Sequence, residues 1–221
     1  MTEIFYSLSD NNKIPLDKKL DNLFCGKREG IYIELGAFDG LSQSNTAFFE
    51  FYRHWKGVLI EPSKDSYELC CKNRPNSVVL NMCCVSDEYK LDTIKGDFNS
   101  ITMASVNGSR LNSDKLVEVN CTTLEKIINT HLENKPIDLL SLDTEGYEFE
   151  ILKGLNLDKN RPKYMLIEIY AEDYVKINDY LLTKDYLLHS NFSNYNKKDN
   201  PIWDGTHNDF LFYDKLCNDL V

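Results

Sequence analysis

The chain has 221 residues, 42% of them hydrophobic and 12% aromatic, a length that suits one globular domain with a sizeable core. Its 35 Asp and Glu against 25 Lys and Arg leave a net charge of −10, which disfavours nucleic-acid binding because phosphate backbones are repelled and the longest basic runs are only pairs. No segment approaches the roughly 18 uninterrupted apolar residues of a membrane span, so a membrane partner is not expected either.

Residues 1–29 form a polar N-terminal extension, in which the leucine spacing predicts a short helix over residues 15–24. Residues 30–221 form the main domain, in which short apolar strands alternate with helices. The strands are predicted at residues 31–35, 57–60, 78–85, 137–142, 164–169, 186–192 and 209–213. The helices are predicted at residues 44–55, 63–73, 124–132, 147–155 and 172–183.

This alternation indicates an open α/β sheet, because continuous apolar strands separated by helices are typical of parallel strands buried on both faces. The last two strands have no helix between them, so we expect them to pair antiparallel at the sheet edge. Residues 86–119, called the excursion below, are too long for a simple loop. We expect a small hairpin there, with one strand at residues 116–120, and its role stays open.

The first strand leads into a turn that carries Gly36 and Gly40. Small residues there let the backbone approach a ligand, and open α/β sheets bind ligands beyond the carboxyl ends of their strands. The pattern lacks the G-x-G-x-x-G of dinucleotide sites, and Glu34 at the strand end suits a positively charged ligand, such as a sulfonium or an amino group, better than a pyrophosphate. A plain tight turn without a ligand is the alternative.

An acidic residue, Glu61, ends the second predicted strand, where a carboxylate binds the two hydroxyls of a ribose in nucleotide-binding sheets. A solvated strand-end carboxylate is the alternative. The turn and Glu61 together favour a ligand that contains adenosine. Ser86 and Asp87 follow the third predicted strand, which is the natural place for contacts to the adenine edge.

Two further carboxylates, Asp143 and Glu145, follow the fourth predicted strand and directly precede a helix. In that position they could hold the amino group of the ligand, act as a general base or bind a divalent metal. One of them could instead cap the helix or offset its dipole.

These segments together resemble the FkbM-type family of S-adenosylmethionine-dependent O-methyltransferases. The resemblance runs from about residue 31 to residue 213 and rests on the segments ELGAFDG, IEP, VSD and LDTEGYEFEILKGL, the last being the most specific. The first motif is also similar to that of the small catechol-type O-methyltransferases.

The resemblance implies a Rossmann-like class I methyltransferase fold with a seven-stranded, mostly parallel sheet, an antiparallel edge strand and helices on both faces. It implies S-adenosylmethionine as the cofactor, with the ribose on Glu61, the adenine on Ser86 and Asp87, and Asp143 also in contact. The methionine part would be surrounded by Glu34, Gly36, Ala37, Asp39, Ser42 and Asn45, with Ser42 near its carboxylate.

The implied reaction is an in-line methyl transfer to a hydroxyl of a small acceptor, most often a sugar or glycan. Alignment supplies much of the acceleration, and a positioned base adds roughly 10²–10⁴-fold. Asp143 and Glu145 are the preferred bases, and His207, in a polar loop before the last strand, is the runner-up. Metal-dependent relatives keep an acid–amide pair after the fifth strand, whereas this chain has Glu168 followed by Ile169, which puts a magnesium site in doubt.

Two other functions stay open at this point. One is a nucleotide-dependent oxidoreductase, which the missing G-x-G-x-x-G disfavours, and the other is a non-catalytic binding module on the same fold. Seven cysteines without a C-x-x-C pair, and a start that does not resemble a signal peptide, lead us to expect reduced, mostly buried thiols and a cytoplasmic location. The acceptor, association with glycosyltransferases and the oligomeric state also stay open.

Overall fold

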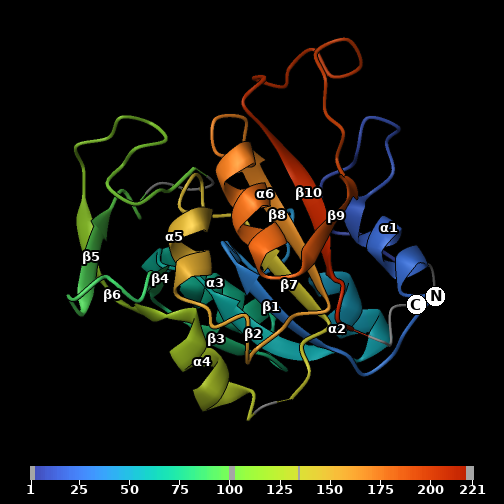
Figure 1. Cartoon of the computed structure of the whole chain (residues 1–221). Coiled ribbons are helices and arrows are strands. Elements are labelled where there is room, and N and C mark those ends of the chain that lie inside the picture. Colours follow the sequence, from blue (N-terminus) through green and yellow to red (C-terminus); the bar gives the residue numbers. More distant parts are fainter. Residues whose placement is uncertain (1–2, 100–102, 134, 218–221) are drawn as a thin grey trace.

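The computed structural model describes residues 3–99, 103–133 and 135–217 and has a seven-stranded main sheet (Figure 1). The strand order is β3-β2-β1-β7-β8-β10-β9. The strands are β1 (Ile31–Leu35), β2 (Lys56–Ile60), β3 (Val78–Leu80), β7 (Leu139–Leu142), β8 (Tyr164–Tyr170), β9 (Tyr186–Asn191) and β10 (His207–Asp214).

The sheet is mostly parallel, as expected from the sequence. All pairs from β3 to β8 run parallel, whereas β10 pairs antiparallel with both β8 and β9. The predicted antiparallel pairing of the last two strands is therefore confirmed. In the β8–β10 register Glu168 lies opposite Asp209, which places two acidic residues side by side in the sheet.

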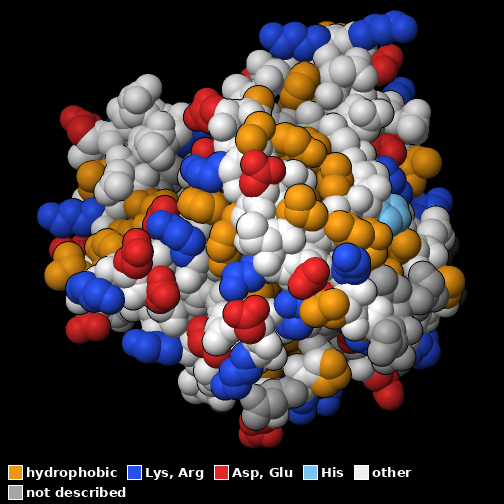
Figure 2. Space-filling view, in the orientation of Figure 1, with side chains coloured by type: hydrophobic (Ala, Val, Ile, Leu, Met, Phe, Trp, Pro, Cys, Tyr) orange, Lys and Arg blue, Asp and Glu red, His pale blue; other side chains and the backbone are white. Residues whose placement is uncertain are grey.

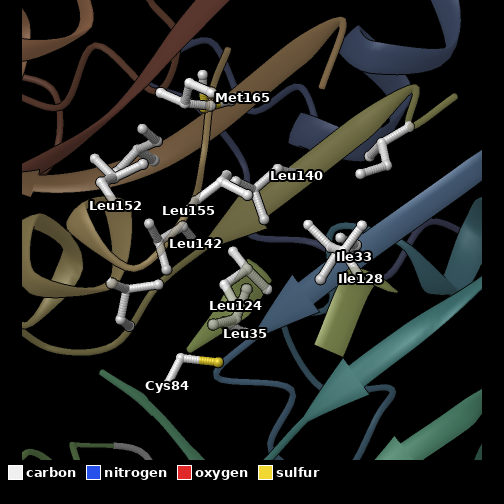
Figure 3. Close-up of a cluster of buried hydrophobic side chains, with 14 of the residues drawn as sticks. Ile33, Leu35, Cys84, Leu124, Ile128, Leu140, Leu142, Leu152, Leu155 and Met165 are labelled. Carbon is white, nitrogen blue, oxygen red and sulfur yellow. The ribbon is translucent and has the colours of Figure 1, made fainter. Parts of the chain in front are cut away.

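Helices cover both faces of the main sheet (Figure 1). Side chains of a strand point alternately to its two faces, so in β1 Tyr32 packs on one side, and Ile33 and Leu35 pack on the other. The side of Tyr32 is covered by α1 (Leu16–Leu23), α2 (Ala47–Arg53) and α3 (Lys64–Asn73). The opposite side is covered by α4 (Leu124–His131), α5 (Glu148–Lys153) and α6 (Tyr174–Thr183), whose aliphatic core is drawn in Figure 3.

The N-terminal helix forms as expected and takes part in the core. Leu16 and Leu20 of α1 are fully buried on the side of the sheet that carries Tyr32. The carboxylate of Asp17 accepts hydrogen bonds from the backbone N–H of Tyr6 and the hydroxyl of Ser7, which fastens the first residues to the helix. A domain boundary at residue 30 stays a prediction.

The single strand predicted at residues 78–85 is wrong. The chain leaves the main sheet after Leu80, and the following strand, β4 (Cys83–Val85), belongs to a second sheet. The side-chain amide of Asn81 donates to the carbonyl oxygens of Glu61 and Pro62, each at 2.9 Å. These bonds hold the chain where it turns away from β2, so the carboxyl end of the third strand of the main sheet lies five residues earlier than the sequence suggested.

The excursion contains the expected hairpin. Its strands β5 (Thr93–Gly96) and β6 (Val117–Thr123) pair antiparallel, and β6 also pairs parallel with β4. The strand predicted at residues 116–120 is therefore present but extends to residue 123. Ile94, Phe98 and Val106 bury a small core of their own against Val85.

The surface drawn in Figure 2 carries Lys and Arg side chains interspersed with Asp and Glu side chains. Four of the seven cysteines are buried, namely Cys70, Cys83, Cys84 and Cys121, and the reduced state of the thiols stays a prediction. Among the residues that the structure describes, no helix is both long and apolar enough to cross a membrane.

Candidate active site

A hollow of about 860 Å³, part of it open to solvent, lies at the carboxyl ends of β1, β2 and β7. Open α/β sheets bind their ligands at this edge. Its wall is formed by residues 35, 36, 38 and 42–44 after β1, residues 60–62 after β2, residues 82–84, residues 98, 104 and 106 of the excursion, and residues 143–145, 147 and 151 after β7.

The glycine turn brings two strand ends into contact. Gly36 has a φ of +78°, and a Cβ at this position would lie 1.8 Å from the carbonyl oxygen of Asp143. Gly40 has a φ of +80° and would meet the side chain of Arg74 at 2.7 Å. Packing of the protein itself therefore requires both glycines, and Gly36 also lies on the wall of the hollow.

Glu34 is buried and lies behind the wall, not on it. Its carboxylate accepts hydrogen bonds from the hydroxyls of Ser44 and Thr46 and from the backbone N–H of Asn45 at 2.8 Å. The guanidinium of Arg74 lies 3.7 Å away. Its oxygens thus fix the loop that follows β1, and the structure places Glu34 away from the hollow, so a contact of Glu34 with the positive end of the cofactor stays a prediction that this arrangement disfavours.

Of the other predicted methionine contacts in this loop, only Ser42 lies on the wall. Asp39 accepts hydrogen bonds from the backbone N–H of Ser42 at 2.7 Å and from its hydroxyl at 2.8 Å, so it shapes the turn. The amide of Asn45 donates to the hydroxyl of Ser141 at 3.0 Å, and Ala37 is buried. These three residues support the loop from behind.

Glu61 lies on the wall, as predicted, and is only 6% exposed. Its two oxygens accept hydrogen bonds from the backbone N–H groups of Phe38 and Ser63, each at 2.8 Å. Burial raises the pKa of this carboxyl to about 7. Each carboxylate oxygen can accept a second bond, so Glu61 can still bind two hydroxyl groups of a ligand.

Ser86 and Asp87, predicted to contact adenine, lie away from this wall. Asp87 lines a different hollow of the described structure, because β4 belongs to the second sheet. Met82 and Cys83 take the expected place beside Glu61. Sequence reasoning missed them because it assumed one unbroken strand, although the polar Asn81 in the middle of that run was a signal for a break.

Three carboxylates meet beside the hollow, two of them on its wall after β7 and the third in β8 behind it. Asp143, Glu145 and Glu168 each offer an oxygen, and these oxygens lie within 4.8 Å of one another. Burial raises the pKa of Asp143 well above its usual value, and the charge of Glu145 raises it further. Burial, and then Asp143, likewise raise the pKa of Glu168. The sequence shows Glu168 near the end of a strand, but no local pattern indicates that its side chain lies beside Asp143 and Glu145.

Glu145 is held by two further side chains. The hydroxyl of Tyr170 donates to Glu145 Oε2 at 2.6 Å, and Arg110 Nε donates to the same oxygen at 3.1 Å. Arg110 also bonds to Asp204 at 2.6 Å, so it joins the excursion to this end of the site and to the loop between β9 and β10. Sequence reasoning missed Arg110, because no local pattern shows which distant acids it contacts.

His207 lies beside the three carboxylates but not on the wall of the hollow. Its Nε2 is 3.3 Å from Glu168 Oε1, and its Nδ1 lies 2.9 Å from the hydroxyl of Thr206. Burial is the largest influence on its pKa and lowers it. The structure therefore brings all three predicted proton acceptors, Asp143, Glu145 and His207, to one end of the site, where a bound hydroxyl could lose a proton.

Comparison with known proteins identifies a matching family and solved structures with a similar fold. The sequence model of the methyltransferase FkbM domain matches residues 34–188. No curated protein sequence matches significantly.

Three solved structures with similar folds are all methyltransferase or RNA-processing proteins. The 23S rRNA methyltransferase ErmE has a TM-score of 0.52 and 10% identity, covering 95% of this chain and 70% of that one. A fibrillarin pre-rRNA processing protein of Methanococcus jannaschii has a TM-score of 0.50 and 14% identity, with 91% and 76% coverage. TrmK of M. capricolum, in complex with S-adenosylhomocysteine, has a TM-score of 0.50 and 9% identity, with 89% and 67% coverage. At such identities the likeness shows the fold alone.

Proposed function

The chain belongs to the FkbM methyltransferase family, a class that depends on S-adenosylmethionine, and from this premise we propose that it methylates a hydroxyl group of a sugar or glycan. The main support for this proposal is the set of residues that line the hollow. Gly36 and the buried Glu61 lie on its wall together with the acidic loop of Asp143. It thus combines a place for a ribose with a group that can accept a proton.

The cofactor would lie along the carboxyl ends of β2, β1 and β7. Its adenine would contact Met82 and Cys83, its ribose hydroxyls would donate to Glu61, and its methionine part would pass between Gly36 and Ser42. All of these residues line the same hollow. The sulfonium would then face Asp143, whose ionised carboxylate favours a nearby positive charge.

We propose Asp143 as the first proton acceptor of the reaction. Its carboxyl lies on the wall, and its raised pKa makes the ionised form a stronger base than an exposed aspartate. Glu145 is less suited because Tyr170 and Arg110 already donate to it. His207 is the second candidate, since its lowered pKa favours the neutral ring that accepts a proton.

A sugar acceptor is favoured over RNA by charge. The chain carries a net charge of −10, and basic side chains on the face drawn in Figure 2 lie among acidic ones. RNA remains the competing acceptor because the solved neighbours include an rRNA methyltransferase. Association with glycosyltransferases, which would supply the acceptor, and a cytoplasmic location belong to the same proposal.

The test is methyl transfer from isotope-labelled S-adenosylmethionine to a panel of neutral sugars, nucleotide sugars and RNA. We expect label on a sugar hydroxyl, and roughly 10²–10⁴-fold slower transfer by Asp143→Asn. Asp87→Asn is the matched control, because Asp87 lies in a different hollow, and it should keep full activity.

Transfer to RNA but not to any sugar would contradict the proposed acceptor. Full activity in Asp143→Asn, in His207→Gln and in the double variant would remove both residues as proton acceptors. Cofactor binding without transfer to any acceptor of the panel would favour the non-catalytic module.

A further inference from the structure

A buried carboxylate oxygen beside the hollow has no hydrogen-bond partner among the described residues. Glu168 is 9% exposed, and its Oε2 atom is buried without a hydrogen bond to any described residue. A buried acceptor of this kind destabilises the fold, more so when it is charged, unless something binds it. The carboxylate of Glu168 is directed toward those of Asp143 and Glu145, with an oxygen from each residue within 4.8 Å of the others.

We propose that Asp143, Glu145 and Glu168 bind one divalent cation of the hard class that prefers oxygen ligands, Mg²⁺ or Mn²⁺. Such ions hold oxygen atoms at about 2.0–2.1 Å, so two ligands on opposite sides of the ion lie roughly 4 Å apart. The observed spacing therefore allows the three oxygens to close around one ion with small side-chain movements. A set of oxygen donors without thiolate or imidazole ligands favours Mg²⁺ or Mn²⁺ over Zn²⁺.

The backbone supports this arrangement. Asp143 and Glu145 follow β7, Glu168 lies in β8, and these two strands pair parallel in the middle of the sheet. Three single-oxygen ligands leave positions on the ion for water or for an acceptor hydroxyl, as is common for Mg²⁺. The ion would thus lie at the wall of the hollow, where Asp143 and Glu145 are exposed to it.

The charged groups around the three carboxylates leave an excess of negative charge, which favours a cation. Among described residues, the basic groups in contact with the three carboxylates are Arg110, on Glu145, and His207, on Glu168 Oε1. Asp209 adds a fourth acidic side chain, buried opposite Glu168 in the β8–β10 register. The single positive charge of Arg110 does not neutralise these four acidic side chains. Because Arg110 contacts Glu145, it competes with the ion for that carboxylate.

A shared proton is the competing explanation. An oxygen of Asp143 lies within 4.8 Å of an oxygen of Glu168, and a proton shared between the two carboxylates would relieve the same repulsion. The cation site rests on geometry and not on the proposed methyl transfer, so a binding measurement tests it independently. An ion bound to these carboxylates would occupy the oxygens of Asp143, so in the ion-bound protein the proposed reaction would use its second candidate, His207, as the proton acceptor.

The experiment is titration of the full chain with Mn²⁺ at neutral pH, followed by electron paramagnetic resonance and calorimetry, with Mg²⁺ as competitor. We expect one Mn²⁺ per chain, displaced by Mg²⁺, and roughly tenfold or greater weakening in Glu168→Gln. Arg110→Gln should bind Mn²⁺ roughly fivefold more tightly, because a competing charge near Glu145 is removed. Glu150→Gln is the matched control, since it removes a carboxylate that pairs with Lys153 elsewhere on α5, and its affinity should not change.

Absence of Mn²⁺ binding by the folded wild-type chain would overturn the proposal in favour of the shared proton. Equal affinity in wild type and Glu168→Gln would place the ion elsewhere and overturn it too. Circular dichroism checks that the variant folds, and Glu145→Gln replaces it if it does not. S-adenosylhomocysteine binding in the same samples separates failure of the ion site from failure of the proposed function.

Discussion

Three acidic residues that end strands of one sheet have different surroundings, and these surroundings decide what each can do. Glu34 is surrounded by hydrogen-bond donors of its own loop and by Arg74. Glu61 has two backbone donors and still faces the hollow. Asp143 faces the hollow beside two other carboxylates. Position at a strand end is visible in sequence, whereas the partners that occupy or free a carboxylate are contributed by residues far along the chain.

The raised pKa of Glu61 predicts a specific pH dependence of stability. A carboxyl whose pKa rises from 4.5 to about 7 on folding binds its proton more tightly in the folded state. Its contribution to stability is therefore full below pH 4.5 and is lost as the pH rises through about 7. We expect Glu61 to lower the unfolding free energy by on the order of 3 kcal/mol across this window.

The measurement is urea unfolding of wild type and Glu61→Gln from about pH 4 to about pH 8. Asp143 and Glu168 change stability in the same direction in both proteins, so the difference between the two curves isolates Glu61. As the pH rises, the unfolding free energy of wild type should fall relative to that of Glu61→Gln. A difference that does not vary with pH would show that Glu61 titrates normally.

At the scale of the elements, the hydrophobic pattern predicted where strands and helices lie, but it did not predict where the chain leaves one sheet for another. The alternation of strands and helices located the main sheet, because strands buried on both faces leave long apolar runs. The run at residues 78–85 misled because two short strands of different sheets follow each other with only Asn81 and Met82 between them. The contribution of Phe98 and Val106 to the site depends on how the excursion folds back, which no local pattern encodes.

The contact between the ends of β1 and β7 predicts a sharp difference between two glycines. Gly36→Ala should destabilise the protein by more than about 3 kcal/mol, because the new Cβ would lie 1.8 Å from the Asp143 carbonyl oxygen and the φ is +78°. Gly146→Ala is the control. It has a φ of +98° but nothing within 4 Å of the added Cβ, so it should cost about 1–2 kcal/mol.

Urea unfolding of both glycine variants checks this. Equal losses would show that backbone conformation alone, and not the close approach of the strands, requires Gly36.

At the scale of the whole molecule, the fold class, the seven-stranded sheet and the family could be predicted from the sequence. The candidate site could be predicted only in part. Gly36, Ser42, Glu61, Asp143 and Glu145 line the hollow as expected, whereas Met82, Glu168 and Arg110 emerged only from the structure. Motifs at strand ends identify the site residues that belong to those motifs. The site residues contributed by the neighbouring strand and by the excursion depend on tertiary packing, which local motifs do not show.

The central claim is that the hollow beyond β1, β2 and β7 binds S-adenosylmethionine. Calorimetric titration of wild type and Glu61→Gln with S-adenosylmethionine, S-adenosylhomocysteine and NADH tests it most directly. We predict that wild type binds the first two at one site and does not bind NADH, and that Glu61→Gln binds about 10- to 100-fold more weakly because charge-assisted bonds to the ribose are lost. Equal affinity in the variant would contradict the ribose assignment. Preference for NADH, or binding of none of the three by folded wild type, would contradict the account of this hollow as a cofactor site.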